Sequence, residues 1–345
     1  MMTLAGCEKT VPSANMDISV PEEKKVVERL PETTKETFEA VTDIEVSEPD
    51  KTYYLNSKKI MFFDDKGRYY YVYKGGRDSA YYVLGCETED RKYSFLKNAD
   101  DFTAYLYKNG VFYGNYRQNK FCSFEDGKYK ELKYEEKDMS DFYFTEEYIY
   151  FLCRDEIGTE IFRMRYDGSD AESVAYINLQ ISKYALHGSR IFYEADYMKY
   201  GVYDTETASN TSLDEGGAGI FSGDYMYYVS GDHSLFRMNI NDYSCEKISE
   251  NIRRIALSDG YIIYQPYTNS ARDDGRIYRL GKGENKKIFD AYESLGNDYY
   301  YDISAIQADE EKIFIEVNSG AFYDYIAEID IDGNIVDNVY THNGV

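Results

Sequence analysis

The stretch that decides the fold is Phe142–Ile177, FYFTEEYIYFLCRDEIGTEIFRMRYDGSDAESVAYI. Within it, the apolar run Tyr148–Leu152 is typical of a strand that is buried on both faces. Glu160–Tyr166 alternates polar with apolar residues, which predicts a half-buried strand, and the Asp167–Gly168 pair favours a hairpin turn. Shorter aromatic and β-branched runs lie before and after these two strands. The stretch therefore predicts four short strands in a row.

The buried second strand recurs from Thr52 onward at a spacing of about 40 residues, each time after a polar turn. Its copies are Arg68–Tyr73, Val111–Tyr113, Tyr148–Leu152, Arg190–Tyr193, Tyr225–Val229, Tyr261–Tyr264 and Lys312–Val317. Such a period with four strands per unit indicates a β-propeller, in which each sheet buries its faces on its neighbours. We therefore predict an all-β, seven-bladed β-propeller of four-stranded blades over residues 51–345, preceded by a disordered N-terminal tether. The alternative is a long meander whose periodicity is accidental.

The blades are expected to start near residues 59, 103, 141, 182, 219, 253 and 302. Asn334–Tyr340 has the pattern of an outer strand of the last blade, and Thr52–Leu55 has the same pattern before the first blade. Because propellers often complete one blade with strands from both termini, we expect Thr52–Leu55 to join the seventh blade. It could replace the C-terminal strand or lie beside it.

The chain opens with MMTLAGC, residues 1–7. Leu4-Ala5-Gly6-Cys7 resembles the lipobox of bacterial lipoproteins, with an apolar residue and two small residues before the cysteine. The resemblance implies that Cys7 is acylated through its thiol and becomes the mature N-terminus. We therefore expect an extracytoplasmic protein that is lipid-anchored to the bacterial cell membrane, with Cys7 as the lipidation site.

Residues 8–50 have the composition of a flexible acidic tether. They hold four of the five prolines, 12 acidic residues and 5 basic residues, and Phe38 is their only aromatic residue. Such a segment buries too little apolar surface to offset the loss of chain entropy, so we predict that it is disordered. A spacer of this kind would lift the propeller clear of the membrane.

The formal net charge is −24, and acidic residues are spread along the whole chain. This charge argues against nucleic acid as a partner, because phosphates require a basic face. It also disfavours direct docking on anionic lipid. No run of 18 apolar residues occurs, so membrane contact is expected only through the lipid at Cys7. We expect a monomer.

The third strands share the pattern I-Y/F-R-h-x-x-D-G, where h is an apolar residue. Its clearest copies are Ile161–Met164, Leu235–Met238 and Ile277–Leu280. The pattern resembles the propellers of low-density-lipoprotein-receptor type and those of uncharacterised bacterial lipoprotein families, over about residues 52–340. The YWTD signature of the receptors is missing, and the chain has no tryptophan. The resemblance therefore implies a fold and carries no receptor function.

No arrangement of residues predicts a catalytic or metal site. The three histidines, His187, His233 and His342, fall in two unlike loops and the tail, so no Ser/His/Asp set can be nominated. Asp330–Asn334 begins like a calcium loop but lacks its closing glutamate, so we predict a hairpin turn there. The cysteines other than Cys7 have no metal spacing and are expected to be small buried residues. No metal and no cofactor are expected.

Surface recognition is then the predicted function. In a propeller, the loops between second and third strands share one face with the connections between blades, and arginine and tyrosine are favoured recognition residues. The candidate binding residues on that face are Arg77, Tyr116, Arg117, Arg154, Asp155, Tyr197, His233, Tyr267 and Arg272. We expect a non-catalytic binding module for an unknown protein, peptide or glycan. The alternative is a glycan-active hydrolase or lyase that uses carboxylates in the central channel.

Overall fold

The computed structural model shows an all-β chain that divides between residues 37 and 38, with every sheet in the second part. It describes residues 39–47, 61–63, 69–75, 80–87, 92–99, 102–108, 110–116, 120–125, 128–134, 137–196, 198–268, 275–295, 301–308, 312–319 and 323–341. The lipobox predicted at residues 1–7, which includes Cys7, lies outside these ranges.

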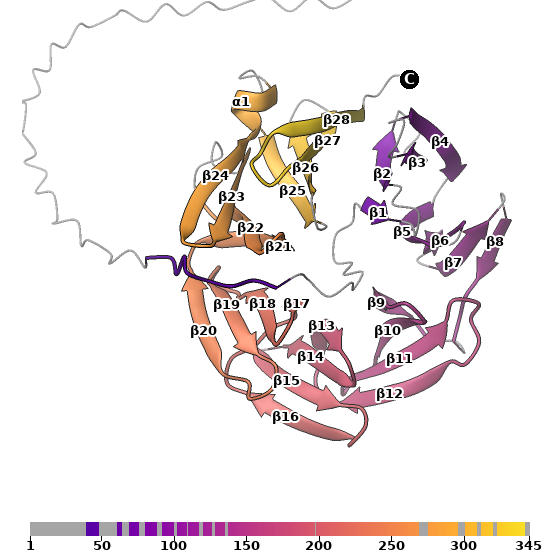
Figure 1. Cartoon of the computed structure of the whole chain (residues 1–345). Coiled ribbons are helices and arrows are strands. Elements are labelled where there is room, and N and C mark those ends of the chain that lie inside the picture. The colour runs from indigo at the N-terminus through magenta and orange to yellow at the C-terminus, as the bar shows by residue number, and fades with distance from the viewer. Residues whose placement is uncertain are drawn as a thin grey trace, which may run out of the picture. The chain divides into compact units, whose positions relative to one another are not determined.

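The strands form four-stranded antiparallel sheets in which neighbours in sequence are neighbours in the sheet (Figure 1). The first sheets are β1 (Met61–Phe63), β2 (Tyr69–Gly75), β3 (Ala80–Glu87), β4 (Lys92–Ala99); β5 (Phe102–Lys108), β6 (Val111–Tyr116), β7 (Lys120–Glu125), β8 (Lys128–Glu131); β9 (Ser140–Phe144), β10 (Tyr148–Arg154), β11 (Thr159–Arg165), β12 (Glu172–Ile177). Next come β13 (Ile181–His187), β14 (Arg190–Ala195), β15 (Lys199–Asp204), β16 (Ser209–Leu213); β17 (Ile220–Ser222), β18 (Tyr225–Val229), β19 (Leu235–Asn239), β20 (Cys245–Ser249). The last are β21 (Ile252–Ser258), β22 (Tyr261–Pro266), β23 (Arg276–Gly281), β24 (Glu284–Asp290), then helix α1 (Ala291–Leu295), and β25 (Tyr301–Ala308), β26 (Ile313–Ser319), β27 (Tyr323–Ile329), β28 (Ile335–Thr341).

Consecutive sheets from β5–β8 onward pack on one another through apolar side chains. Between β5–β8 and β9–β12, the rings of Phe121 and Phe142 stack with centroids 4.0 Å apart. One buried cluster joins β9–β12, β13–β16 and β17–β20, and there the Tyr143 hydroxyl donates to the Leu186 carbonyl of the next sheet at 3.4 Å. Two further clusters join β17–β20 to β21–β24 and β21–β24 to β25–β28. These side chains make the sheets blades of a propeller.

The predicted number of blades is wrong, because the described packing supports six blades, β5–β8 to β25–β28. Strands β1–β4 do pair as a further four-stranded sheet, but only their backbone is described, so the described packing does not assign that sheet as a blade. A sequence period predicts strands and their pairing. A blade also requires a face that packs on its neighbours.

The arginine of the third-strand pattern has the same place in three blades. It lies over the ring of the tyrosine that opens the second strand. The distances from guanidinium carbon to ring centroid are 4.6 Å for Arg163 over Tyr148, 5.0 Å for Arg237 over Tyr225 and 5.0 Å for Arg279 over Tyr261. This cation–π contact explains why the pattern recurs, and it shows that these blades share one register.

Residues 39–47, named here the docked segment, contradict the prediction of a disordered tether up to the propeller. The segment is extended, and it lies against β17–β20 and β21–β24 (Figure 1). Ile44 and Val46 are buried in the cluster between these two blades, while Asp43 and Glu45 are exposed. This alternation is typical of a strand with one apolar face. Burial of that face anchors the segment, which is not assigned as a strand of either sheet.

The hairpin turn predicted at Asp330–Asn334 is confirmed, and it joins β27 to β28. Asp330 Oδ1 accepts hydrogen bonds from the backbone N–H of Asp332 at 3.0 Å and of Asn334 at 2.8 Å. Strand β28 follows as the outer strand of its sheet, as expected for Asn334–Tyr340. Thr52–Leu55, expected to close the propeller, lies outside the described residues.

Two of the cysteines are buried, as predicted. Cys122 and Cys153 are free thiols in the cluster that joins β5–β8 and β9–β12. Burial raises the pKa of each thiol to about 11, so both are protonated at neutral pH. Cys245, a third free cysteine, is partly exposed. Within the ranges that the structure describes, no helix has the length and apolar character to cross a membrane.

Candidate functional site

The loops between second and third strands carry exposed apolar side chains at one end of the sheets. We name as the loop surface the five residues Ile157, Met198, Gly231, His233 and Tyr267. They come from four consecutive blades, β9–β12 to β21–β24. The connections from each fourth strand to the next blade lie at the same end, because the strands alternate in direction.

Arg154, at the end of β10, joins two blades. Its Nε and Nη2 atoms donate to the Ile181 carbonyl of β13 at 3.2 and 2.8 Å, and Nη2 lies 2.6 Å from Asp141 Oδ2. Its Nη1 donates to Ser140 Oγ at 2.6 Å. The guanidinium nominated for recognition is thus engaged with its own chain, which fixes the base of the loop that follows.

Asp155 organises that loop. Its Oδ1 accepts hydrogen bonds from the N–H groups of Ile157 at 2.8 Å and Gly158 at 2.7 Å. The Tyr176 hydroxyl donates to its Oδ2 at 3.1 Å. The backbone hydrogen bonds from Gly158 and Ile157 lower the pKa of Asp155, so the carboxylate stays ionised.

The loop that Asp155 folds presents Ile157 to solvent. The Ile157 side chain is 73% exposed, the largest exposure among the described large apolar residues. An aliphatic side chain at the tip of a rigid loop gains nothing from the fold itself. Its exposure therefore suits contact with another molecule.

His233 and Tyr267 form a flat stacked pair across two blades. Their ring centroids lie 3.5 Å apart with an interplanar angle of 12°. The His233 backbone has a φ of 65°, and its carbonyl accepts from Ile252 N–H at 2.8 Å. The Tyr267 N–H donates to the Asn251 carbonyl at 2.6 Å. Backbone contacts thus fix both rings, and Tyr267 remains 40% exposed.

Asp232, the residue before His233, also stabilises its own loop through hydrogen bonds. Ser230 Oγ donates to Asp232 Oδ1, and Ser234 Oγ donates to Asp232 Oδ2 at 3.1 Å. The hydrogen bond from Ser230 is the main reason why the pKa of Asp232 is lowered. The His233 loop is therefore held by internal hydrogen bonds, as the Asp155 loop is.

Met198 is an exposed apolar residue that approaches the His233 loop. It lies in the turn between β14 and β15 with a φ of 54°, and its side chain is 71% exposed. A Cβ added to Gly231 would lie 3.6 Å from the Met198 Cε, so the methionine extends to the loop of the next blade. Its flexible thioether side chain can adapt to a partner surface.

Acidic side chains surround the loop surface. The exposed acids in the loops and connections at this end are Asp155, Glu156, Asp196, Asp214, Glu215 and Asp232. Lys199 is an exposed base among them. Exposed apolar side chains among acidic residues favour a partner with apolar side chains and positive charge.

The structure places four of the nine nominated loop residues with their side chains: Arg154, Asp155, His233 and Tyr267. Tyr116 is described only as the last residue of β6. The others, Arg77, Arg117, Tyr197 and Arg272, lie outside the described residues. Ile157 and Met198 were not nominated. The signal that could have found Ile157 is an apolar residue inside the polar turn Asp155–Gly158.

A glycosidase acid requires a raised pKa. Asp155, Asp232 and Asp290 all have lowered pKa values, and in Asp290 the lowering comes from hydrogen bonds and ion pairs with Lys287 and Arg276. Among the described residues, no group of three or more His, Cys, Asp or Glu side chains is arranged to hold a metal ion.

Comparison with known proteins finds likeness at the level of the fold. No family model matches the chain. No curated protein matches it either. A solved structure of YCF48 bound to D1 peptide is 9% identical with a TM-score of 0.53, covering 82% of this chain and 94% of that chain.

Two other propeller-like structures are similar to the same degree. The computationally designed Ika8 protein is 12% identical with a TM-score of 0.51, covering 88% of this chain and 91% of its own. Sqt1 of Saccharomyces cerevisiae is 10% identical with a TM-score of 0.50, covering 88% and 90%. At such identities the likeness shows a β-propeller fold and nothing finer.

Proposed function

We propose that this protein is a non-catalytic binding module that recognises a segment of another protein on the loop surface. The observation that carries the proposal is the exposure of the apolar side chains of Ile157, Met198 and Tyr267 in loops between second and third strands, at one end of blades β9–β12, β13–β16 and β21–β24. Propellers commonly serve as binding modules, and YCF48, which is similar in fold, was solved with a peptide bound.

A protein segment suits this surface better than a glycan. The Ile157 and Met198 side chains offer aliphatic contact area and no hydrogen-bonding groups, whereas a sugar requires many directed hydrogen bonds. The stacked pair of His233 and Tyr267 supplies a flat aromatic anchor of the kind found at the centre of protein interfaces. The acidic rim would select a partner with basic residues around its apolar anchor.

The binding experiment uses the full chain against a random peptide display library and, in parallel, a glycan array. We expect selected peptides to combine apolar and basic residues. Met198→Asp should weaken their binding at least tenfold, because it places a charge in the apolar contact.

The matched control for Met198→Asp is Ile335→Asp on β28, another exposed apolar residue, at 37% exposure, outside the loop surface. It should leave the affinity within twofold. Equal loss in both variants, or enrichment on glycans alone, would contradict the proposal.

The lipid anchor at Cys7 and the extracytoplasmic location belong to the same proposal, supported by the Leu4–Cys7 sequence. We expect the chain to incorporate labelled palmitate when it is produced in a bacterium, and Cys7→Ser to abolish the label and release the protein from the membrane fraction. Labelling that persists in the Cys7→Ser variant would contradict the anchor.

A further inference from the structure

The docked segment shows how this propeller holds an extended peptide between two blades. Val41 N–H donates to the Ile248 carbonyl at 2.9 Å, and Gly283 N–H donates to the Thr42 carbonyl at 2.9 Å. The Tyr227 hydroxyl reaches the Glu45 carbonyl at 3.5 Å. The Ser222 hydroxyl donates to the Ser47 carbonyl. The segment is thus held by backbone groups, by one tyrosine and by one serine, in addition to the burial of its apolar side chains.

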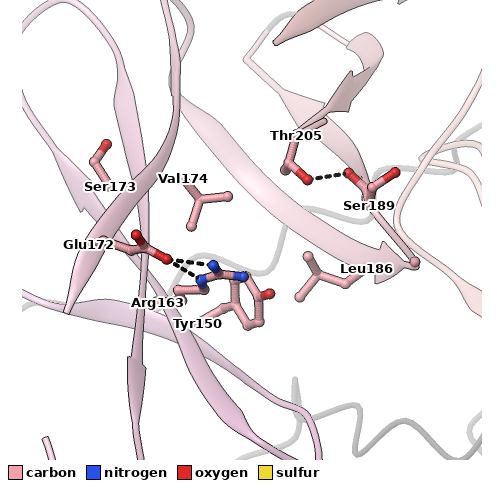
Figure 2. A pocket seen from close by; sticks show the side chains of 9 residues that line it. Tyr150, Arg163, Glu172, Ser173, Val174, Leu186, Ser189 and Thr205 are labelled. Atoms are coloured by element: carbon pink, nitrogen blue, oxygen red, sulfur yellow. Dashed lines mark hydrogen bonds and ion pairs between the residues drawn. The ribbon is translucent and has the colours of Figure 1, made fainter. Parts of the chain in front are cut away.

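A pocket of about 220 Å³ lies at the equivalent place between β9–β12 and β13–β16. Figure 2 shows it, with the Arg163–Glu172 ion pair beside Tyr150 and with Leu186 and Ser189 from the neighbouring blade. It lies at the end of the sheets opposite to the loop surface, because it contains the turns between first and second strands and between third and fourth strands.

Strand register establishes the equivalence of the two sites. In β9–β12, residues 150, 163 and 172 pair across three strands as Tyr–Arg–Glu. In β17–β20, residues 227, 237 and 246 pair in the same order with the same residue types. In the following blades, Leu186 pairs with Ile191 as Leu257 pairs with Ile262. Tyr150 and Leu186, which line the pocket, are therefore the counterparts of Tyr227 and Leu257, which lie in one cluster with the docked segment.

The backbone acceptor is repeated as well. Ile248 is the extra residue of a β-bulge in β20, where the register shifts between Leu235 and Phe236. Val174 occupies the same bulge position in β12 and lines the pocket. A bulge turns a backbone carbonyl away from the regular ladder, and the Ile248 carbonyl uses this freedom to bind the docked segment.

The tyrosine is positioned in the same way at both sites. In both blades the arginine that pairs with this tyrosine is ion-paired to the glutamate of the fourth strand, Arg163 to Glu172 and Arg237 to Glu246. The Tyr227 hydroxyl donates to the Glu45 carbonyl of the docked segment.

We infer that the pocket between β9–β12 and β13–β16 is a second peptide site, which takes an extended segment of a partner protein with β-branched apolar residues at alternate positions. Tyr150 donates to a carbonyl of that segment, and the Val174 carbonyl accepts one of its N–H groups. The occupant is a partner rather than residues 39–47 of this chain, because those residues already fill the equivalent groove.

The size of the pocket agrees with this occupant. A volume of about 220 Å³ is below the range of about 300–1,000 Å³ that small-molecule sites occupy. It has room for one or two side chains of a strand, as Ile44 and Val46 fill the equivalent groove. The inference does not depend on the proposed function, because it concerns the opposite end of the sheets.

The test uses the full chain and a fluorescent synthetic peptide of residues 39–47 with photo-leucine in place of Ile44. We expect saturable binding, with ultraviolet crosslinks to Val174, Leu186 or Ser189. A matched peptide with aspartate at the positions of Ile44 and Val46 should not bind. Crosslinks confined to Leu257 and Ile262 would show exchange with the docked segment and would overturn the inference, as would the absence of saturable binding.

Two tyrosine variants separate the two sites. Tyr150→Phe should weaken peptide binding about threefold to tenfold, the effect of one lost hydrogen bond. Tyr227→Phe is the matched control, with the same change in the groove of the docked segment, and it should leave the affinity within twofold. The reverse order of effects would overturn the inference.

Discussion

Ile44→Ala is expected to lower the free energy of unfolding of the propeller by about 2–5 kcal/mol. The Ile44 side chain is 1% exposed, and it lies in a cluster with Leu257, Ile262 and Leu280 although it precedes the first strand. Its removal leaves a cavity between two blades. Because the chain has no tryptophan, unfolding in urea is best followed by far-ultraviolet circular dichroism.

The control for Ile44→Ala is Asp43→Ala, one residue earlier in the same segment, where the side chain is exposed. This variant should change the free energy of unfolding by less than about 0.5 kcal/mol. If both variants were equally stable, the docked segment would not belong to the folded unit, and its groove could not serve as the template for the second peptide site.

Gly333→Ala should be the most disruptive small substitution at a blade junction. Gly333 lies in the turn between β27 and β28 with a φ of 88°, and a Cβ at this position would overlap the Ile288 carbonyl of the preceding blade. The variant combines backbone strain with a clash against main chain that cannot rotate away. We expect a loss of about 1–3 kcal/mol beyond the cost of the strained backbone.

Gly283→Ala isolates that backbone cost. Gly283 has a φ of 80° in the equivalent turn between β23 and β24, and a Cβ there would meet no atom within 4 Å. It should cost about 1–2 kcal/mol, the penalty of the left-handed conformation for an L-residue. Unfolding midpoints in urea compare the two variants directly. A Gly333→Ala variant no less stable than Gly283→Ala would contradict the close contact between these blades.

The sequence predicted the strands well because their signals are local. The run Tyr148–Leu152 lies within β10, and the turn at Asp167–Gly168 falls between β11 and β12, with Gly168 at a φ of 86°. Such patterns depend only on alternation and on turn chemistry. The number of blades is not a local property, since it depends on which sheets pack face to face, and that prediction failed.

The docked segment was missed for a related reason. Its apolar side chains, Ile44 and Val46, alternate with acids in a region whose overall composition is that of a disordered chain. Its backbone–backbone hydrogen bonds to the propeller go to Ile248 and Gly283, more than 200 residues away in sequence. Composition measures how much apolar surface a segment has, but not whether a groove elsewhere in the chain accepts two side chains.

The sequence predicted only some of the residues that form the loop surface. The preference for arginine and aspartate as recognition residues selected Arg154 and Asp155. In the structure, Arg154 connects two blades and Asp155 stabilises the loop that follows it. The exposed apolar side chains of Ile157, in the same loop as Asp155, and of Met198, in the next blade, were not selected. Whether an apolar residue in a loop turns inward or outward depends on the hydrogen bonds around it, and those form only in the folded protein.

The loop surface can be tested most directly by crosslinking from Met198 with a photo-reactive amino acid in the cells that make this protein. The account predicts one discrete protein adduct. This adduct should disappear when the chain that carries the crosslinker also carries Ile157→Asp. An excess of purified chain without the crosslinker should also abolish it by competition. The same crosslinker at Ile335 should give no such adduct. An adduct formed equally from both positions, or unaffected by Ile157→Asp, would contradict a binding site on the loop surface.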